Sequence, residues 1–157
     1  MAHPPGSHTF PLTQNESPEV DIEIGGLINT TTKTLKAVVD TGFTGFMQVP
    51  IGVGIGTNLN LWGTQTYTLA DGTTSKTLEC VGKVKFLGKE MVGVISLAFT
   101  GDMALLGMVF LQELGMDMVV STNTKEMTFV PVQPTAPPPT ASTEPTPPNA
   151  AVAQASQ

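Results

Sequence analysis

The chain is poor in cysteine and histidine, and these shortages remove several kinds of chemistry. Cys80 is the single cysteine among 157 residues, so no intrachain disulfide can form, which favours a reducing compartment. Its apolar surroundings in the sequence indicate a small buried hydrophobic residue. His3 and His8 both lie in the N-terminal segment, away from any cluster of carboxylates. A nucleophile activated by histidine is therefore excluded from the rest of the chain, and we expect no metal site and no cofactor.

Positive charge is also scarce. Seven Lys and Arg residues stand against thirteen Asp and Glu, which gives a net charge of −6 and a pI near 4.7. The cations are scattered along the chain and form no basic stripe that could contact phosphates. We therefore expect neither nucleic acid nor a membrane among the partners of this protein.

No hydrophobic run is long enough to cross a membrane. The two longest apolar tracts, around Val92–Phe99 and Met103–Leu111, are short and are interrupted by Gly, Ser or Asp. The N-terminal residues lack the basic segment and apolar run of a secretory signal. A cytoplasmic location is the resulting prediction.

Glycine and proline are abundant, with 16 and 13 residues, while aromatic residues make up only 6% of the chain. This composition favours short strands joined by turns over a helical bundle. Residues 1–16 are rich in Pro, Ser, His and Asn and are predicted to be a disordered lead-in. Residues 133–157 form a Pro/Thr/Ala-rich tail, predicted to be disordered and to act as a solvated spacer or as a ligand for a proline-binding module. One domain is expected between them, over residues 17–132.

The pattern within this domain is mostly that of β-strands. Val20, Ile22 and Ile24 alternate with acidic residues, as in a half-buried strand. Asp71-Gly72 suits a tight turn with positive φ and predicts a hairpin between the strands that flank it. Further strands are expected at Leu35–Asp40, Phe46–Val49, Gln65–Leu69, Ser75–Cys80, Val81–Phe86, Met91–Leu97, Met116–Val120 and Glu126–Val132.

One helix is predicted, at Met108–Leu114, because Gly115 is a good residue to end it. The glycine-rich stretch Gly52–Gly56 lacks the strand and helix that would flank a phosphate-binding loop, and we interpret it as a flexible loop.

The most informative run is Val38-Val39-Asp40-Thr41-Gly42. An acidic residue at the end of an apolar strand is unusual, because an unpaired buried carboxylate is costly. Some other group must stabilise Asp40 or share its proton.

From this run onward the sequence resembles the retropepsin-like family of aspartic proteases, whose hallmark is Asp-Thr-Gly after two apolar residues. A second family element, an apolar pair followed by Gly and a short helix, matches Leu105-Leu106-Gly107 and Met108–Leu114. A third, a hairpin called the flap, lies between the other two, as Gln65–Cys80 does here. The resemblance spans about residues 20–132. It implies an all-β, closed barrel of the retropepsin type with one short helix on the C-terminal side.

The resemblance also implies roles for particular residues. Asp40 is the expected catalytic residue, in an active-site loop formed by Thr41, Gly42, Phe43 and Thr44. The flap residues Leu69, Ala70, Asp71, Gly72 and Thr73 are expected to bind substrate. Leu105, Leu106 and Gly107 are expected to brace the active-site loop.

Enzymes of this class use two carboxylates that share one proton, because two like charges in close contact cannot both ionise readily. The ionised carboxylate activates a water molecule, and the protonated one polarises the scissile carbonyl. The chain has only one Asp-Thr-Gly, so a single copy lacks half of the site. A homodimer with two copies of Asp40 on its symmetry axis is therefore expected, with a polypeptide as substrate.

The family pattern is broken at Phe43, where the family most often has a small residue such as Ala or Ser. This change bears on the shape of the pocket and the tuning of the carboxylate pair. The predicted function is that of an aspartic endopeptidase. The alternatives are a non-catalytic dimerisation or peptide-binding module on the same fold, or a structural β-domain whose tail recruits partners.

Overall fold

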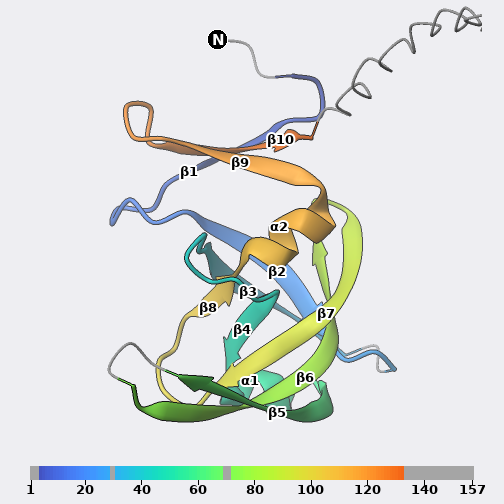
Figure 1. The fold of residues 1–157 in the computed structure, drawn as a ribbon. Coiled ribbons are helices and arrows are strands. Elements are labelled where there is room, and N and C mark those ends of the chain that lie inside the picture. The colour runs from blue at the N-terminus through green and yellow to red at the C-terminus, as the bar shows by residue number, and fades with distance from the viewer. Residues whose placement is uncertain (1–3, 29–30, 69–71, 133–157) are drawn as a thin grey trace, which may run out of the picture.

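The computed structural model describes residues 4–28, 31–68 and 72–132. Ten strands and two short helices lie in these ranges (Figure 1). Their bounds are β1 (His8–Pro11), β2 (Glu19–Gly25), β3 (Thr32–Val39), β4 (Met47–Pro50), α1 (Ile51–Gly56), β5 (Asn60–Thr68), β6 (Thr74–Phe86), β7 (Lys89–Ala98), β8 (Ala104–Leu106), α2 (Met108–Leu114), β9 (Met116–Ser121) and β10 (Glu126–Pro131).

The larger sheet closes on itself into a barrel. Its strand order is β2-β3-β8-β4-β7-β6-β5, and an additional pairing of β2 with β6 joins the two sides of the ring. Six strands therefore form a closed barrel, and β5 is attached outside the ring as the partner of β6. The predicted closed β-barrel is confirmed, as is the helix at Met108–Leu114, which ends at Gly115 with φ of 73°.

Alternating apolar residues explain how the strands face the core. Val20, Ile22 and Ile24 of β2 are all buried, whereas Asp21 between them is exposed. A strand places successive side chains on opposite faces, so this alternation directs one face of β2 inward.

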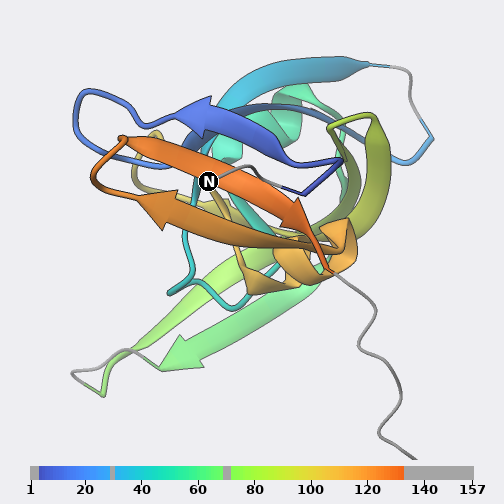
Figure 2. The same cartoon turned by 90° about the horizontal axis from the view of Figure 1, so that it is seen from above.

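A smaller sheet covers one end of the barrel. Its strand order is β1-β10-β9, with both pairs antiparallel, and we call it the terminal sheet. Helix α2 lies between the terminal sheet and the barrel (Figure 1). Figure 2 shows the terminal sheet lying across this end of the barrel, while the hairpin of β5 and β6 extends to one side.

A row of phenylalanine rings connects the terminal sheet to the barrel. Phe129 of β10 contacts Phe86 of β6 at a centroid distance of 5.3 Å, and Phe86 lies 6.0 Å from Phe110 of α2. Phe110 in turn lies 5.7 Å from Phe46, which follows the predicted active-site loop. The position of this loop is thus coupled to packing in the core.

Replacing Phe110 by Ala is expected to lower the free energy of unfolding by about 3–5 kcal/mol, because Phe110 is completely buried and the substitution leaves a cavity. Chemical denaturation measures the change. The same substitution at Phe99, which is 60% exposed, should cost far less. Equal losses at the two positions would contradict the packing described above.

The N-terminal segment is not wholly unstructured, which corrects the prediction of a disordered lead-in over residues 1–16. His8–Pro11 form β1 and pair with β10. Phe10 supplies the physical reason, because its ring lies 5.9 Å from those of both Phe86 and Phe129. One aromatic side chain thus anchors a segment whose composition is otherwise typical of disorder. The predicted tail, residues 133–157, lies outside the described residues.

The glycine-rich stretch is a helix, α1, and not the flexible loop that was expected; the barrel therefore carries a second short helix. Gly54 packs so closely that a Cβ atom there would lie 2.6 Å from Cδ2 of Leu97. The hydroxyl of Thr57, which is fully buried, donates a hydrogen bond of 2.8 Å to the carbonyl of Val53. Close packing against β7 thus holds this stretch in a helix despite its glycines.

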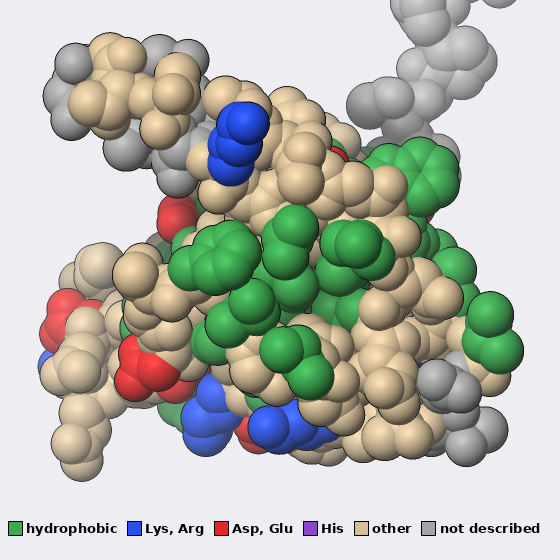
Figure 3. Space-filling view, turned by 90° about the horizontal axis from the view of Figure 1, so that it is seen from below, with side chains coloured by type: hydrophobic (Ala, Val, Ile, Leu, Met, Phe, Trp, Pro, Cys, Tyr) green, Lys and Arg blue, Asp and Glu red, His purple; other side chains and the backbone are tan. Residues whose placement is uncertain are grey.

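The other end of the barrel, near α1 and β5, carries exposed apolar side chains. Figure 3 shows hydrophobic side chains gathered at the centre of this face. Ile55 of α1 and Leu61 and Trp62 of β5 are each at least two-thirds exposed. Within the part of the chain that the structure describes, neither helix has the length to span a membrane.

Candidate active site

Asp40 follows β3 directly, and the barrel fixes its position. β3 runs parallel to β8, with Val38 opposite Leu105 and Val39 opposite Leu106. The backbone N–H of Asp40 continues this ladder by donating to the carbonyl of Leu106 at 2.9 Å. Val39 and Leu106 are buried, whereas Asp40 itself is only partly buried. The carboxylate therefore stands where the strand leaves the core.

The loop after Asp40 turns back onto the carboxylate. The N–H of Gly42 donates to Oδ1 of Asp40 at 2.8 Å, and the N–H of Phe43 donates to the backbone carbonyl of Asp40 at 3.1 Å. A Cβ atom at Gly42 would lie 3.1 Å from the same Oδ1. This geometry keeps the carboxylate oriented by its own loop and leaves little room for a side chain at Gly42.

The start of α2 holds the other side of the loop. Gly107 N–H donates to the carbonyl of Phe46 at 3.1 Å, and Met108 N–H donates to that of Phe43 at 2.9 Å. Val109 N–H donates to the carbonyl of Gly45 at 3.2 Å. The first N–H groups of a helix have no partner within it, so the loop carbonyls satisfy groups that would otherwise need a cap.

Gly107 lies against the loop with no space for a side chain. A Cβ atom there would lie 2.2 Å from the carbonyl oxygen of Gly45 and 2.5 Å from that of Phe43. At the far end of α2, the ammonium group of Lys89 donates to the carbonyls of Glu113 and Leu114. Both ends of this short helix are thus attached to other parts of the molecule.

The structure shows how a large residue is accommodated at Phe43. Its ring occupies the space above two glycines, because a Cβ atom at Gly45 would lie 2.4 Å from Cζ of Phe43 and one at Gly107 would lie 2.7 Å from Cδ1. The ring is half-buried, and the hydrogen bond from Gly42 to Asp40 is kept beside it. Phe43 therefore packs on the loop without displacing the carboxylate. Thr41 and Thr44 are exposed.

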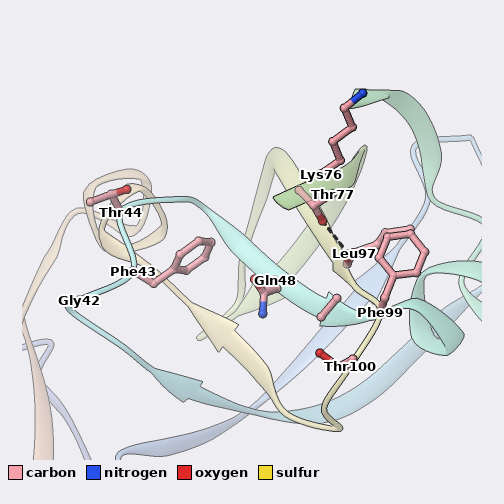
Figure 4. A pocket seen from close by; sticks show the side chains of 10 residues that line it. Gly42, Phe43, Thr44, Gln48, Lys76, Thr77, Leu97, Phe99 and Thr100 are labelled. Carbon is pink, nitrogen blue, oxygen red and sulfur yellow. Dashed lines mark hydrogen bonds between the residues drawn. The ribbon is translucent and has the colours of Figure 1, made fainter. Parts of the chain in front are cut away.

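A pocket of about 550 Å³ opens beside this loop (Figure 4). It lies between the loop, β6 of the hairpin and the end of β7, and among the described residues that line it only Lys76 is charged. The hydroxyl of Thr77 donates to the carbonyl of Leu97 at 2.7 Å, which ties the hairpin to β7. The lining residues are Gly42, Phe43, Thr44, Gln48, Lys76, Thr77, Leu97, Ala98, Phe99 and Thr100.

Most of these pocket residues were not identified from the sequence. Gln48 could have been identified from the sequence, because it is a polar residue between two apolar ones, the buried Met47 and Val49 of β4. Lys76 and Thr77 belong to the predicted hairpin but lie beyond the residues assigned to its tip. Phe99 follows β7. No local sequence pattern indicated that it lines the pocket, because its position depends on how β7 ends against β4.

The predicted flap is the hairpin of β5 and β6, which extends beyond the barrel (Figure 2). Thr68 pairs with Thr74 at its last described register position. Leu69, Ala70 and Asp71 lie outside the described residues. Gly72 has φ of 82°, the conformation expected of glycine in a tight turn, and both Gly72 and Thr73 are exposed.

Other side chains that could act as nucleophiles, acids or metal ligands lie apart from the loop. Cys80 is buried, and burial raises the pKa of its thiol, which disfavours the reactive thiolate. Asp102 and Asp117 are exposed. Within the described ranges, no three His, Cys, Asp or Glu side chains form a group that could hold a metal ion.

No protein-family model and no curated protein sequence matches the chain. Among solved structures, "EIAV protease complexed with the inhibitor HBY-793" is similar, with a TM-score of 0.53 and 19% sequence identity; the match covers 66% of this chain and 93% of that chain. The likeness establishes the fold, which is retropepsin-like as the sequence predicted.

Proposed function

We propose that this protein is an aspartic endopeptidase that acts as a homodimer, with Asp40 from each copy forming the catalytic pair. The observation that carries the proposal is the position of Asp40. It lies on a loop held by its own Gly42 and by the N-terminus of α2, on a fold shared with a protease.

The exposure and the orientation of the Asp40 carboxylate support a role in the hydrolysis of peptide bonds. The carboxylate is partly exposed, so a water molecule can reach it, and its orientation is set before substrate binds. Two such carboxylates in close contact share one proton, so that one acts as general base on water and the other as general acid toward the scissile carbonyl. A preorganised pair of this kind needs no cofactor.

The substrate expected for this site is an extended polypeptide. The pocket beside the loop is lined by Leu97, Ala98 and Phe99 as well as by polar residues, which suits a substrate side chain of mixed or apolar character. Strand β6 of the hairpin forms one wall of the pocket. We expect the hairpin to cover a bound peptide. Closure of such a hairpin excludes water and adds backbone hydrogen bonds to the substrate.

Cleavage of unfolded polypeptides is the experiment that tests the proposal. The rate is expected to rise and then fall as pH increases, because activity requires a carboxylate pair that holds a single proton. Fragments are separated by mass spectrometry across the acidic to neutral range. Peptide binding without any cleavage across that range would overturn the proposal in favour of a non-catalytic binding module.

A further inference from the structure

Lys76 places a positive charge at the pocket beside the Asp40 loop, although the chain as a whole is acidic. Thirteen Asp and Glu residues stand against seven Lys and Arg, yet no acid is found among the described residues that line this pocket. The side chain of Lys76 is exposed, and within the described ranges its ammonium group takes part in no ion pair. It is therefore available to a negative charge that a bound molecule brings.

The backbone that carries Lys76 is fixed by its neighbours on both sides. Lys76 pairs with Thr66 of β5, and the hydroxyl of the adjacent Thr77 donates to the carbonyl of Leu97 in β7 at 2.7 Å. Figure 4 shows Lys76 at the rim of the pocket, on the side opposite Phe43. A lysine ammonium sits on a flexible four-carbon stem, so it can turn toward a bound charge while its backbone stays in place.

The other lining residues suit a side chain that has an apolar stem and a charged end. Leu97 and Phe99 supply apolar surface, and Phe99 is 60% exposed. Gln48 and Thr100 supply an amide and a hydroxyl, both of which can donate hydrogen bonds to a carboxylate. Glutamate has this combination of methylene groups and a terminal carboxylate, and aspartate is one methylene shorter.

We propose that this pocket selects peptides that carry an acidic side chain, and that Lys76 is the residue that determines the preference. The inference rests on the proposed function, because the pocket adjoins Gly42 of the Asp40 loop. A carboxylate pair that shares one proton keeps one negative charge, which repels an acidic substrate. Lys76 offsets that repulsion for one substrate side chain. The attraction becomes stronger when the hairpin closes, because water between the charges is removed.

Peptides that differ at one residue test the preference. A single Glu is placed at successive positions around the scissile bond, and each peptide is compared with its Gln counterpart, which has the same shape without the charge. At the position that meets Lys76, kcat/KM should be roughly three- to thirtyfold higher for the Glu peptide, as expected for an ion pair that is partly removed from water. Added salt should reduce this ratio, because it screens the attraction.

Variants of Lys76 assign the preference to this residue. Lys76→Met keeps most of the apolar stem and removes the charge, so the ratio of Glu to Gln peptide should fall close to one. Lys76→Glu should reverse the preference, so that a Lys peptide is cleaved faster than a Glu peptide. Lys85→Glu is the matched control, because Lys85 is an exposed residue near the other end of β6 that does not line the pocket. It makes the same change in net charge and should leave the preference intact.

Peptide binding to the Asp40→Asn variant separates this inference from the proposed function. Fluorescence anisotropy of labelled Glu and Gln peptides gives their dissociation constants without cleavage. Tighter binding of the Glu peptide that is lost on adding Lys76→Met would support the acidic preference, even if the wild type cleaved no peptide. Equal cleavage of Glu and Gln peptides at every position would overturn the inference, and the proposed function would stand if that cleavage depended on Asp40. A preference that persists in Lys76→Glu would also overturn it.

Discussion

Replacing Asp40 by Asn is expected to lower kcat/KM for peptide cleavage by roughly a hundred- to ten-thousandfold, the usual contribution of a positioned acid or base. The substitution keeps the shape of the side chain, and an amide oxygen can still accept the hydrogen bond that Gly42 donates to Oδ1. The loop should therefore keep its conformation, while the amide can neither take a proton from water nor share one with the second copy. Steady-state kinetics measures the loss of activity, and thermal unfolding of the same sample shows whether the fold is retained.

The control for this variant is Asp102→Asn, which removes one negative charge from an exposed loop. Its cleavage rate should equal that of the wild type. A mixing experiment extends the test, because a heterodimer contains only one functional Asp40. An equimolar amount of the Asp40→Asn variant should leave about half of the wild-type chains in wild-type homodimers after subunits exchange, and activity should fall in the same proportion. Unchanged turnover by the Asp40→Asn variant alone would remove Asp40 from the mechanism.

Replacing Gly107 by Ala is expected to disrupt both the fold near the site and the activity. The new Cβ atom would lie 2.2 Å from the carbonyl oxygen of Gly45, and a backbone atom cannot move aside as the end of a flexible side chain can. Overpacking of this kind costs about 1–3 kcal/mol of unfolding free energy. The loop must shift to relieve the contact, and a displacement of about 1 Å at a reacting group can reduce the rate a hundredfold.

Gly52→Ala is the matched control for Gly107→Ala. A Cβ atom at Gly52 meets nothing within 4 Å, and the residue lies within α1, where Ala is favoured over Gly by about 0.5–1 kcal/mol. Stability should therefore be unchanged or slightly raised, with normal cleavage. Denaturant titration and kcat/KM are measured for both variants. A Gly107→Ala protein as stable and active as the wild type would show that contact between α2 and the loop does not set the geometry of Asp40.

Much of the fold could be predicted from the sequence because its signals are local. Alternation of apolar residues identified β2, and Asp71-Gly72 identified the hairpin of β5 and β6. Leu114 followed by Gly115 marked the end of α2 correctly. Local sequence patterns gave wrong predictions at two segments, β1 and α1, where long-range packing determines the structure. One ring, Phe10, brings β1 into the terminal sheet, and contact between Gly54 and Leu97 favours a helix over a loop at α1.

The sequence by itself identified Asp40 as the residue of interest, since a charge at the end of an apolar strand, followed by Thr-Gly, needs a chemical reason. It also determined that one chain lacks a second such carboxylate. Only the tertiary structure decided how Phe43 is accommodated, which residues line the pocket, and that β1 and β9 pair with β10 to form the terminal sheet. The physical reason is that strand pairing and side-chain packing join residues far apart in the chain, and no local pattern records which of them meet.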